Sequence, residues 1–167
     1  MSSKAHKINA PRYVKTGIIT VSTTRSLKED KSGHWISKRA KREGHEVVFH
    51  QVITDDSDII TQTVKDVITD PAPQVLLITG GTGISSKDVT IEAVRPLFTK
   101  ELTAFGPIFA QLSFEQIDSA AILSRATAGV IEETILFCIP GSINACKLAC
   151  KAIIFPELGH VVRHIHE

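Results

Sequence analysis

Apolar and polar positions along the 167-residue chain fall into two alternating patterns. Short runs of mostly apolar, often β-branched residues are typical of strands buried in a parallel sheet. These runs predict strands at 14–21, 45–53, 75–79 and 134–139. Between the runs, apolar residues recur at intervals of three and four, which is typical of amphipathic helices. The spacing predicts helices at 32–43, 56–69, 105–116 and 144–155, with a further helical segment from residue 90 that Pro96 bends or ends.

Glycine and proline mark the ends of several predicted helices. Gly44 is a suitable C-cap for the first helix, and the segment 70–73, Asp-Pro-Ala-Pro, stops the second. Pro156 follows the last predicted helix and leaves a histidine-bearing tail. Alternating strands and helices with short connections predict one α/β domain whose sheet is covered on both faces. We expect this domain to span 13–167, after a polar tail at 1–12.

Small and hydroxyl residues follow three of the predicted strands. These segments are Ser22-Thr23-Thr24, Gly80-Gly81-Thr82-Gly83 and Pro140-Gly141-Ser142. Ligands of open α/β sheets bind beyond the carboxyl ends of the strands, where glycines leave backbone N–H groups accessible to anions. The glycine segment lacks the lysine of a P-loop and the third glycine of a dinucleotide fingerprint. It predicts a phosphate site, with a ligand-free glycine turn as the alternative.

Charge, hydropathy and cysteine content argue against a nucleic-acid-binding, membrane-spanning or disulfide-rich secreted protein. The 19 basic and 18 acidic residues leave no electrostatic footprint for nucleic acid, and the basic cluster at 38–42 is typical of a solvated helix face. There is no apolar run of membrane-spanning length and no secretory signal, which predicts a cytoplasmic protein. The three cysteines, Cys138, Cys146 and Cys150, argue for a reducing compartment rather than a disulfide framework. No activating base for a catalytic cysteine is evident.

Four separated segments occur in the order typical of one family: LLITGGTGISSKDVTIEAVRPLF, ELTAFGPIFAQLSFEQI, LSRATAGV and IPGSINACK. Together they resemble the MoaB/MogA family of molybdenum cofactor biosynthesis over about residues 14–158, and they are closer to the MoaB branch. The resemblance implies a three-layer α/β/α molybdopterin-binding fold with a mostly parallel central sheet. It also implies assembly as a homotrimer or hexamer, to which a metal-insertion protein can dock.

The same resemblance implies a reaction in which molybdopterin and ATP, with Mg²⁺, give adenylylated molybdopterin and pyrophosphate. The terminal phosphate of molybdopterin is a nucleophile that needs almost no general base, because its second pKa is about 6. Catalysis then consists of aligning two anions and neutralising their charge. The alternative is a molybdopterin-binding protein of the same pathway that lacks adenylyl transfer.

Two aspartates match the acidic positions of the family, Asp88 in KDVT and Asp55 in VITDD. Their implied role is to hold Mg²⁺ near the triphosphate, since hard cations favour carboxylate oxygen. The alternative interpretation is that each aspartate is the N-cap of the helix that follows it. Asp56 and Asp58 are neighbouring candidates.

The other implied site residues belong to the loops at the strand ends. Arg125 either forms a fork to a phosphate or makes a salt bridge at a subunit contact. The residues implied to bind molybdopterin or phosphate are Gly80, Gly81, Thr82, Gly83, Ser124, Arg125, Pro140, Gly141 and Ser142. Those implied, with less force, to contact nucleotide are Ser22, Arg25, Ser32 and Gly33, with Asp30 nearby. For Glu115, ligand contact and helix packing are both open interpretations.

Two further features have competing interpretations. His160, His164 and His166 form a pattern in which an i, i+4 pair can place two imidazoles on one helix face, so a separate metal site is an alternative function. The apolar face of 105–117 is compatible with a subunit interface or with core burial.

Overall fold

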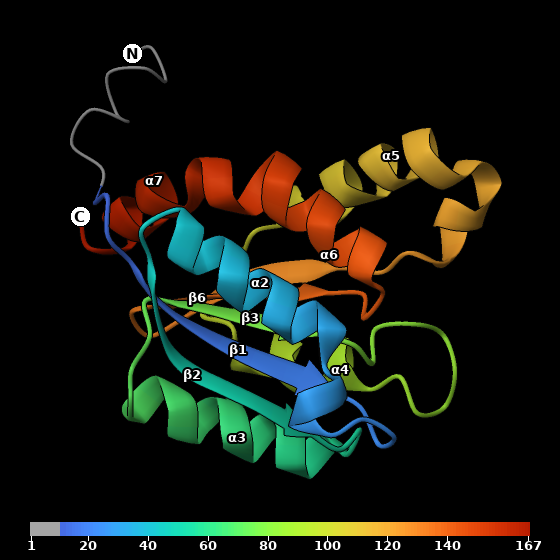
Figure 1. The fold of residues 1–167 in the computed structure, drawn as a ribbon, viewed down its shortest axis with the longest axis horizontal. Helices are drawn as coiled ribbons and strands as arrows, with labels where there is room; N and C mark the ends of the chain where they lie inside the picture. Colours follow the sequence, from blue (N-terminus) through green and yellow to red (C-terminus); the bar gives the residue numbers. More distant parts are fainter. Residues whose placement is uncertain (1–10) are drawn as a thin grey trace.

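The computed structural model describes residues 11–167, so the predicted tail at 1–12 lies almost entirely outside the described residues. A six-stranded sheet, in the order β2-β1-β3-β6-β5-β4, forms the centre (Figure 1). Four neighbouring strands are parallel: β2 (Glu46–Ile53), β1 (Lys15–Val21), β3 (Val75–Thr79) and β6 (Thr134–Ile139). Two antiparallel strands, β5 (Thr127–Ile131) and β4 (Lys100–Glu101), complete the edge beyond β6.

Helices cover both faces of the sheet, which confirms the three-layer prediction (Figure 1). One face carries α2 (Lys31–Arg42), α5 (Phe105–Ile117), α6 (Ile143–Ala149) and α7 (Phe155–Ile165). The other carries α3 (Ser57–Thr69) and the short α4 (Thr90–Val94). Adjacent residues of β1 face opposite layers, since Ile18 belongs to the first core and Ile19 to the second.

The strands at the centre of the sheet were predicted to within one or two residues because they are buried on both faces. Every residue of β3 and of β6 is buried, and such strands have continuous apolar sequences. Strand β5 was not predicted. Its hairpin to β6 turns through Glu132 and Glu133, with Glu132 at φ +53°, and contains neither the glycine nor the asparagine that normally marks such a turn.

The predicted end of the last helix at Phe155 was wrong. Helix α6 continues through a π-helical turn, Cys150–Ile154 (η4), directly into α7, which contains Pro156 in its first turn. Proline lacks a backbone N–H and crowds the preceding turn, and both are tolerated at the start of a helix or beside a π-bulge. The histidines predicted to lie in a tail are therefore on a helix, with His166 as its C-cap.

Several 3₁₀ turns connect the main elements: η1 (Leu27–Glu29), η2 (Arg95–Leu97) and η3 (Asp118–Leu123). The α-helix α4 ends at Val94 and Pro96 lies in η2, so the expectation that Pro96 bends or ends this helical segment is confirmed. Within residues 11–167, no helix is both long and apolar enough to cross a membrane.

The buried carboxylate of Asp30 joins β1, β2 and α2. It has no exposed surface, and it caps α2 by accepting a hydrogen bond from the Gly33 N–H at 2.8 Å. Thr20 of β1 donates to it at 2.7 Å, and His50 Nε2 of β2 lies 2.8 Å away. Any side chain at Gly33 would collide with this group, because a Cβ there would lie 2.0 Å from Asp30 Oδ2. The network anchors the loop that connects β1 to α2.

We expect Asp30→Ala to lower the free energy of unfolding by about 3 kcal/mol, because it removes a helix cap and leaves His50 without its buried carboxylate. Urea denaturation followed by circular dichroism measures the change. Asp58→Ala is the matched control: Asp58 is exposed in the first turn of α3, and its loss should cost well under about 1 kcal/mol. Equal losses in the two variants would contradict a stabilising role for the Asp30 network.

The same network predicts a pH dependence. Burial opposes ionisation of Asp30, but hydrogen bonds from His50, Gly33 and Thr20 outweigh it, so the pKa lies below the ordinary value of 3.8. A carboxyl with a lowered folded-state pKa stabilises the fold above its unfolded pKa, and this contribution is lost as the pH falls through the folded pKa. The difference in unfolding free energy between wild type and Asp30→Asn should therefore be constant near neutrality and shrink below about pH 4. Denaturation at a series of pH values tests this.

Candidate functional site

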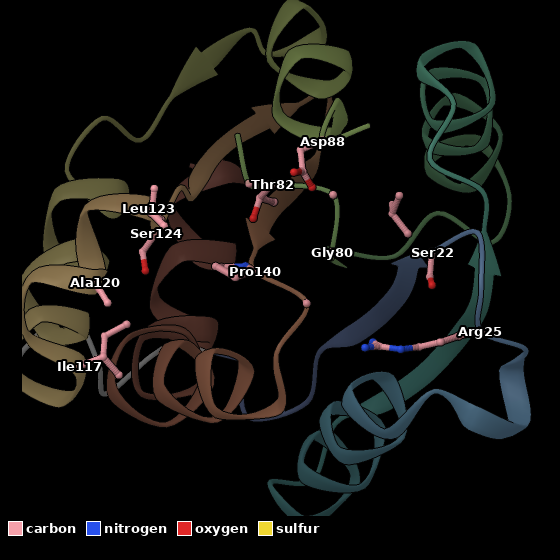
Figure 2. Close-up of a pocket in the computed structure, with 14 residues that line it drawn as sticks. Ser22, Arg25, Gly80, Thr82, Asp88, Ile117, Ala120, Leu123, Ser124 and Pro140 are labelled. Atoms are coloured by element: carbon pink, nitrogen blue, oxygen red, sulfur yellow. The ribbon is translucent and has the colours of Figure 1, made fainter. Parts of the chain in front are cut away.

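A cleft of about 420 Å³ lies beyond the carboxyl ends of β1, β3 and β6 (Figure 2). Its lining comes from the three predicted loops together with η3 and the end of α5. The lining residues are Val21, Ser22, Arg25, Gly80, Gly81, Thr82, Gly83, Asp88, Ile117, Ala120, Leu123, Ser124, Pro140 and Gly141. The predicted convergence of three strand ends on one rim is confirmed.

The floor of the cleft is a tight turn that only glycine can make. Gly80 and Gly81 have φ values of +98° and +64°. A Cβ at Gly81 would lie 2.3 Å from the Thr90 hydroxyl oxygen, which donates to the Gly80 carbonyl at 2.9 Å. The Thr90 N–H also donates to the Gly81 carbonyl at 2.9 Å. Helix α4 therefore holds the turn through both groups of Thr90.

Asp88 supplies the acidic group of the cleft, and its carboxylate points into the space between the loops (Figure 2). Its Oδ2 accepts hydrogen bonds from the Ser85 hydroxyl at 2.7 Å and the Ser85 N–H at 2.9 Å. These bonds, and the positive charge of Arg125, hold the pKa of Asp88 below its usual value against a desolvation effect that raises it. The capping alternative for Asp88 was wrong, because Val89 is the N-cap of α4 and no side chain caps that helix.

Arg25 is the basic residue among those that line the cleft, and its guanidinium extends toward the centre (Figure 2). Ser22 lies beside it in the same loop, and its backbone N–H donates to the Ile53 carbonyl of β2 at 2.8 Å. The loop is thus held at one end by β2 and at the other by Asp30. A cationic side chain, an ionised carboxylate and a glycine turn around one cavity suit a phosphorylated ligand accompanied by a divalent cation.

Several predicted residues support the cleft through their hydrogen bonds. Arg125 donates to the Gly83 carbonyl at 3.1 Å and forms an ion pair with Glu92 of α4 within the chain. Ser32 donates to the Gly141 carbonyl at 3.0 Å. Ser142 caps α6 by accepting from the Ala145 N–H at 3.2 Å. These side chains hold the glycine and PGS turns in place, and none of the three is among the lining residues.

Asp55 follows β2 at the same edge of the sheet, but it does not line the cleft. The capping alternative for Asp55 was also wrong: Asp56 is the N-cap of α3 and accepts from the N–H groups of Asp58 and Ile59, each at 3.0 Å. Asp55 itself is half-buried, with the Thr54 hydroxyl 3.4 Å from its Oδ1. The Asp55 carboxylate therefore does not cap α3.

Sequence reasoning missed the apolar wall of the cleft, formed by Ile117, Ala120 and Leu123. These residues lie in the last turn of α5 and in η3, which has no helical periodicity to reveal it. Ile117 and Leu123 are 50% and 54% exposed, an unusual position for large apolar side chains. Glu115 is exposed on α5 and is not among the lining residues.

The three cysteines lie in the core and are not among the residues that line the cleft. All three are buried free thiols, and burial raises the pKa of each. Cys146 contacts the Thr79 hydroxyl at 3.1 Å and the Pro140 carbonyl at 3.3 Å, so it packs beneath the PGS turn.

Within residues 11–167, no cluster of three or more histidine, cysteine or acidic side chains is arranged to hold a metal ion. Asp88 nevertheless fits Mg²⁺, because this cation commonly takes one or two carboxylates together with water and substrate phosphates. The remaining ligands of such an ion would come from the substrates.

Fold and cleft together define a class of protein: an α/β domain with a glycine-floored cleft at the carboxyl edge of a mostly parallel sheet. Residues 17–160 match the family described as the probable molybdopterin binding domain, and the chain belongs to this family. The predicted family resemblance is therefore confirmed.

Individual relatives agree over nearly the whole chain. The molybdenum cofactor biosynthesis protein B of Bacillus subtilis (strain 168) is 47% identical over 168 residues, which cover 100% of this chain and 99% of the relative. A crystal structure of a molybdenum cofactor biosynthesis protein B matches with a TM-score of 0.91 at 42% identity, covering 95% of this chain and 99% of that one. The tungsten cofactor synthesizing protein MoaB of Pyrococcus furiosus matches with a TM-score of 0.86 at 38% identity, over 95% and 100% of the two chains. A MogA structure, at 22% identity and a TM-score of 0.82, shares the fold over 90% of this chain and 99% of that one. The identities of 42–47% to relatives named molybdenum cofactor biosynthesis protein B confirm that the chain is closer to the MoaB branch.

Gly81→Ala tests the turn at the floor of the cleft. We expect it to lower the unfolding free energy by about 3 kcal/mol, because a left-handed backbone costs about 1–2 kcal/mol for alanine and the Thr90 hydroxyl must also leave the Gly80 carbonyl. Gly44→Ala is the control: Gly44 has φ +88°, but a Cβ there would meet nothing within 4 Å, so only the backbone cost applies. Thermal and urea unfolding of both variants measure the difference, and equal losses would rule out the contact with Thr90 as a constraint.

Proposed function

We propose that this protein acts in molybdenum cofactor biosynthesis as a nucleotidyltransferase, converting molybdopterin and Mg-ATP to adenylylated molybdopterin and pyrophosphate. One observation carries the proposal: Arg25 and Asp88 line opposite sides of a glycine-floored cleft in a chain of the molybdopterin-binding domain family. A cleft for a single phosphate needs no acidic group, whereas a cleft for two anions and a cation does.

In the proposed reaction, an oxygen of the molybdopterin phosphate attacks the α-phosphorus of ATP. The new P–O bond forms as the bond from the α-phosphorus to the bridging oxygen of pyrophosphate breaks. The nucleophilic oxygen is already deprotonated near neutrality, because the second pKa of a phosphate monoester is about 6. This agrees with a cleft whose lining contains no histidine. When bound, Mg²⁺ supplies neutralisation of phosphate charge.

The residues of the chain then orient and hold the two substrates. The Arg25 guanidinium is suited to a fork of hydrogen bonds to phosphate oxygens. Thr82 and Ser124 place hydroxyl groups on the lining, as Figure 2 shows. The Asp88 carboxylate, kept ionised by Ser85, holds the cation. The wall of Ile117, Ala120 and Leu123 offers an apolar surface on which a ring system can pack.

Self-association belongs to the same proposal. Large apolar side chains are exposed along α5 and η3: Ile108, Phe114, Ile117, Ile122 and Leu123. Ile122 alone is 87% exposed. Exposed apolar side chains favour an interaction surface, and we propose that those of α5 and η3 contribute the contacts of a homotrimer or hexamer in the cytoplasm, where a metal-insertion protein can dock.

A molybdopterin-binding protein without adenylyl transfer is the second candidate. The observation that favours it is the position of Asp55, which leaves Asp88 as the acidic residue that lines the cleft. If adenylyl transfer requires Mg²⁺ to be held by two carboxylates of this chain, the single carboxylate of Asp88 in the cleft lining is not sufficient.

Adenylyl transfer assayed with purified protein, molybdopterin, ATP and Mg²⁺ separates the two candidates. We expect Asp88→Asn to lower the rate of product and pyrophosphate formation by about 10²–10³-fold, the usual cost of removing one group that stabilises the transition state. Molybdopterin binding should persist in this variant, because the glycine turn and Arg25 remain. Asp58→Asn, on the exposed first turn of α3, should leave the rate unchanged.

The variant Asp55→Asn tests whether the second carboxylate also serves adenylyl transfer. A loss comparable to that of Asp88→Asn would show that both carboxylates serve the reaction. Binding of molybdopterin by the wild type without any adenylylated product would overturn the transferase proposal and establish the second candidate.

A further inference from the structure

A second cavity, of about 510 Å³, lies between α7 and the β4–β5 edge of the sheet and shares no lining residue with the cleft. From α7 it is lined by His160, Val161, His164 and Ile165. From the sheet side it is lined by Thr99, Lys100, Glu101, Leu102, Val130 and Glu132. The cavity exists because α7 continues past Pro156 to Ile165 and carries its histidines over this edge.

The two histidines are one helical turn apart, and their side chains converge. Their Nε2 atoms are 3.0 Å apart, with ring centroids at 4.7 Å and the ring planes inclined at 59°. The Nδ1 atoms point to carboxylates: His160 Nδ1 lies 3.0 Å from Glu157 Oε2, and His164 Nδ1 lies 3.0 Å from Glu167 Oε2. Each imidazole is thus oriented by an acidic residue three positions from it.

This geometry restricts how protons are distributed. An Nδ1–H that donates to a carboxylate fixes the tautomer in which Nε2 carries a lone pair. Two such nitrogens 3.0 Å apart repel unless something positive lies between them. A metal ion placed between the two nitrogens removes this repulsion. Nitrogens bound to one ion at about 2.0–2.1 Å are themselves about 3 Å apart, so little movement is needed to bind it.

We propose that His160 and His164 form a binding site for a divalent transition metal ion such as Zn²⁺, oriented by Glu157 and Glu167. Carboxylates behind metal-binding imidazoles are the usual outer-shell partners of such sites. Imidazole nitrogen selects Zn²⁺, Cu²⁺ or Ni²⁺ over Mg²⁺, which prefers oxygen, so this site is chemically separate from the cleft. Water completes the coordination, since residues 11–167 provide no third protein ligand in place.

The site also has a structural consequence. An ion bound by both imidazoles joins adjacent turns at the C-terminal end of α7 beside the sheet edge. Because it binds the folded helix, it should raise the unfolding temperature of the protein.

Zn²⁺ titration of protein without a histidine tag tests the proposal. Competition with a chromophoric chelator should show one Zn²⁺ per chain, and His160→Ala and His164→Ala should each weaken binding at least about tenfold. His166→Ala is the matched control, since His166 is exposed beyond the last turn of α7 and is not part of the pair. Glu157→Gln should weaken binding while leaving both Nε2 ligands in place.

Circular dichroism verifies that the variants fold. Saturating Zn²⁺ should raise the unfolding temperature of wild type and His166→Ala, but not of His164→Ala, whose side chain is half exposed and dispensable for the core. Zn²⁺ affinity that is equal in wild type and the two pair variants would overturn the proposal, as would the absence of binding by wild type.

Discussion

The backbone of the glycine turn and that of the PGS turn are in contact, and the cleft depends on this close approach. A Cβ at Gly141 would lie 3.0 Å from the Gly80 Cα, and a Cβ at Gly80 would lie 2.4 Å from the Val21 carbonyl oxygen. The turns that follow these strands can approach each other this closely only where side chains are absent. The requirement has a second effect, because turns without side chains leave the space above them open to a ligand.

The polar groups around these turns form a network of hydrogen bonds that supports the cleft. Ser32 and Thr79 donate to the carbonyls of Gly141 and Pro140, Thr90 donates to that of Gly80, and Arg125 to that of Gly83. Behind them, Asp30 ties β1, β2 and α2 together. The loops of the cleft are thus held from below, which keeps Arg25 and Asp88 in place without contact between them. Residues matched to the family as ligand contacts, such as Ser32 and Gly33, belong to this support.

The carboxyl ends of the central strands and the outer edge of the sheet at β4 differ in the chemistry of their side chains. At the carboxyl edge, oxygen ligands, a guanidinium and glycine N–H groups suit phosphates and a hard cation. Beside β4, two imidazoles held by carboxylates suit a borderline-soft metal ion. Two of the exposed apolar residues, Ile117 of α5 and Leu123 of η3, are among the lining residues of the cleft. Self-association over these two residues would therefore also change the wall of the cleft.

The sequence by itself determined the fold class, the positions of the buried strands and the three loops that meet at the cleft, because buried parallel strands and glycine turns are local patterns. Through its resemblance to the family, it also indicated Asp88 and, with less force, Arg25 as site residues. Only the tertiary structure decided what each remaining polar residue does: that Arg125 pairs with Glu92, that Asp56 rather than Asp55 caps α3, and that η3 supplies the apolar wall. It also decided that α7 continues past Pro156 and brings His160 to His164. The physical reason is that hydrogen bonds and ion pairs of side chains join residues distant in sequence, and their partners are chosen by packing rather than by local pattern.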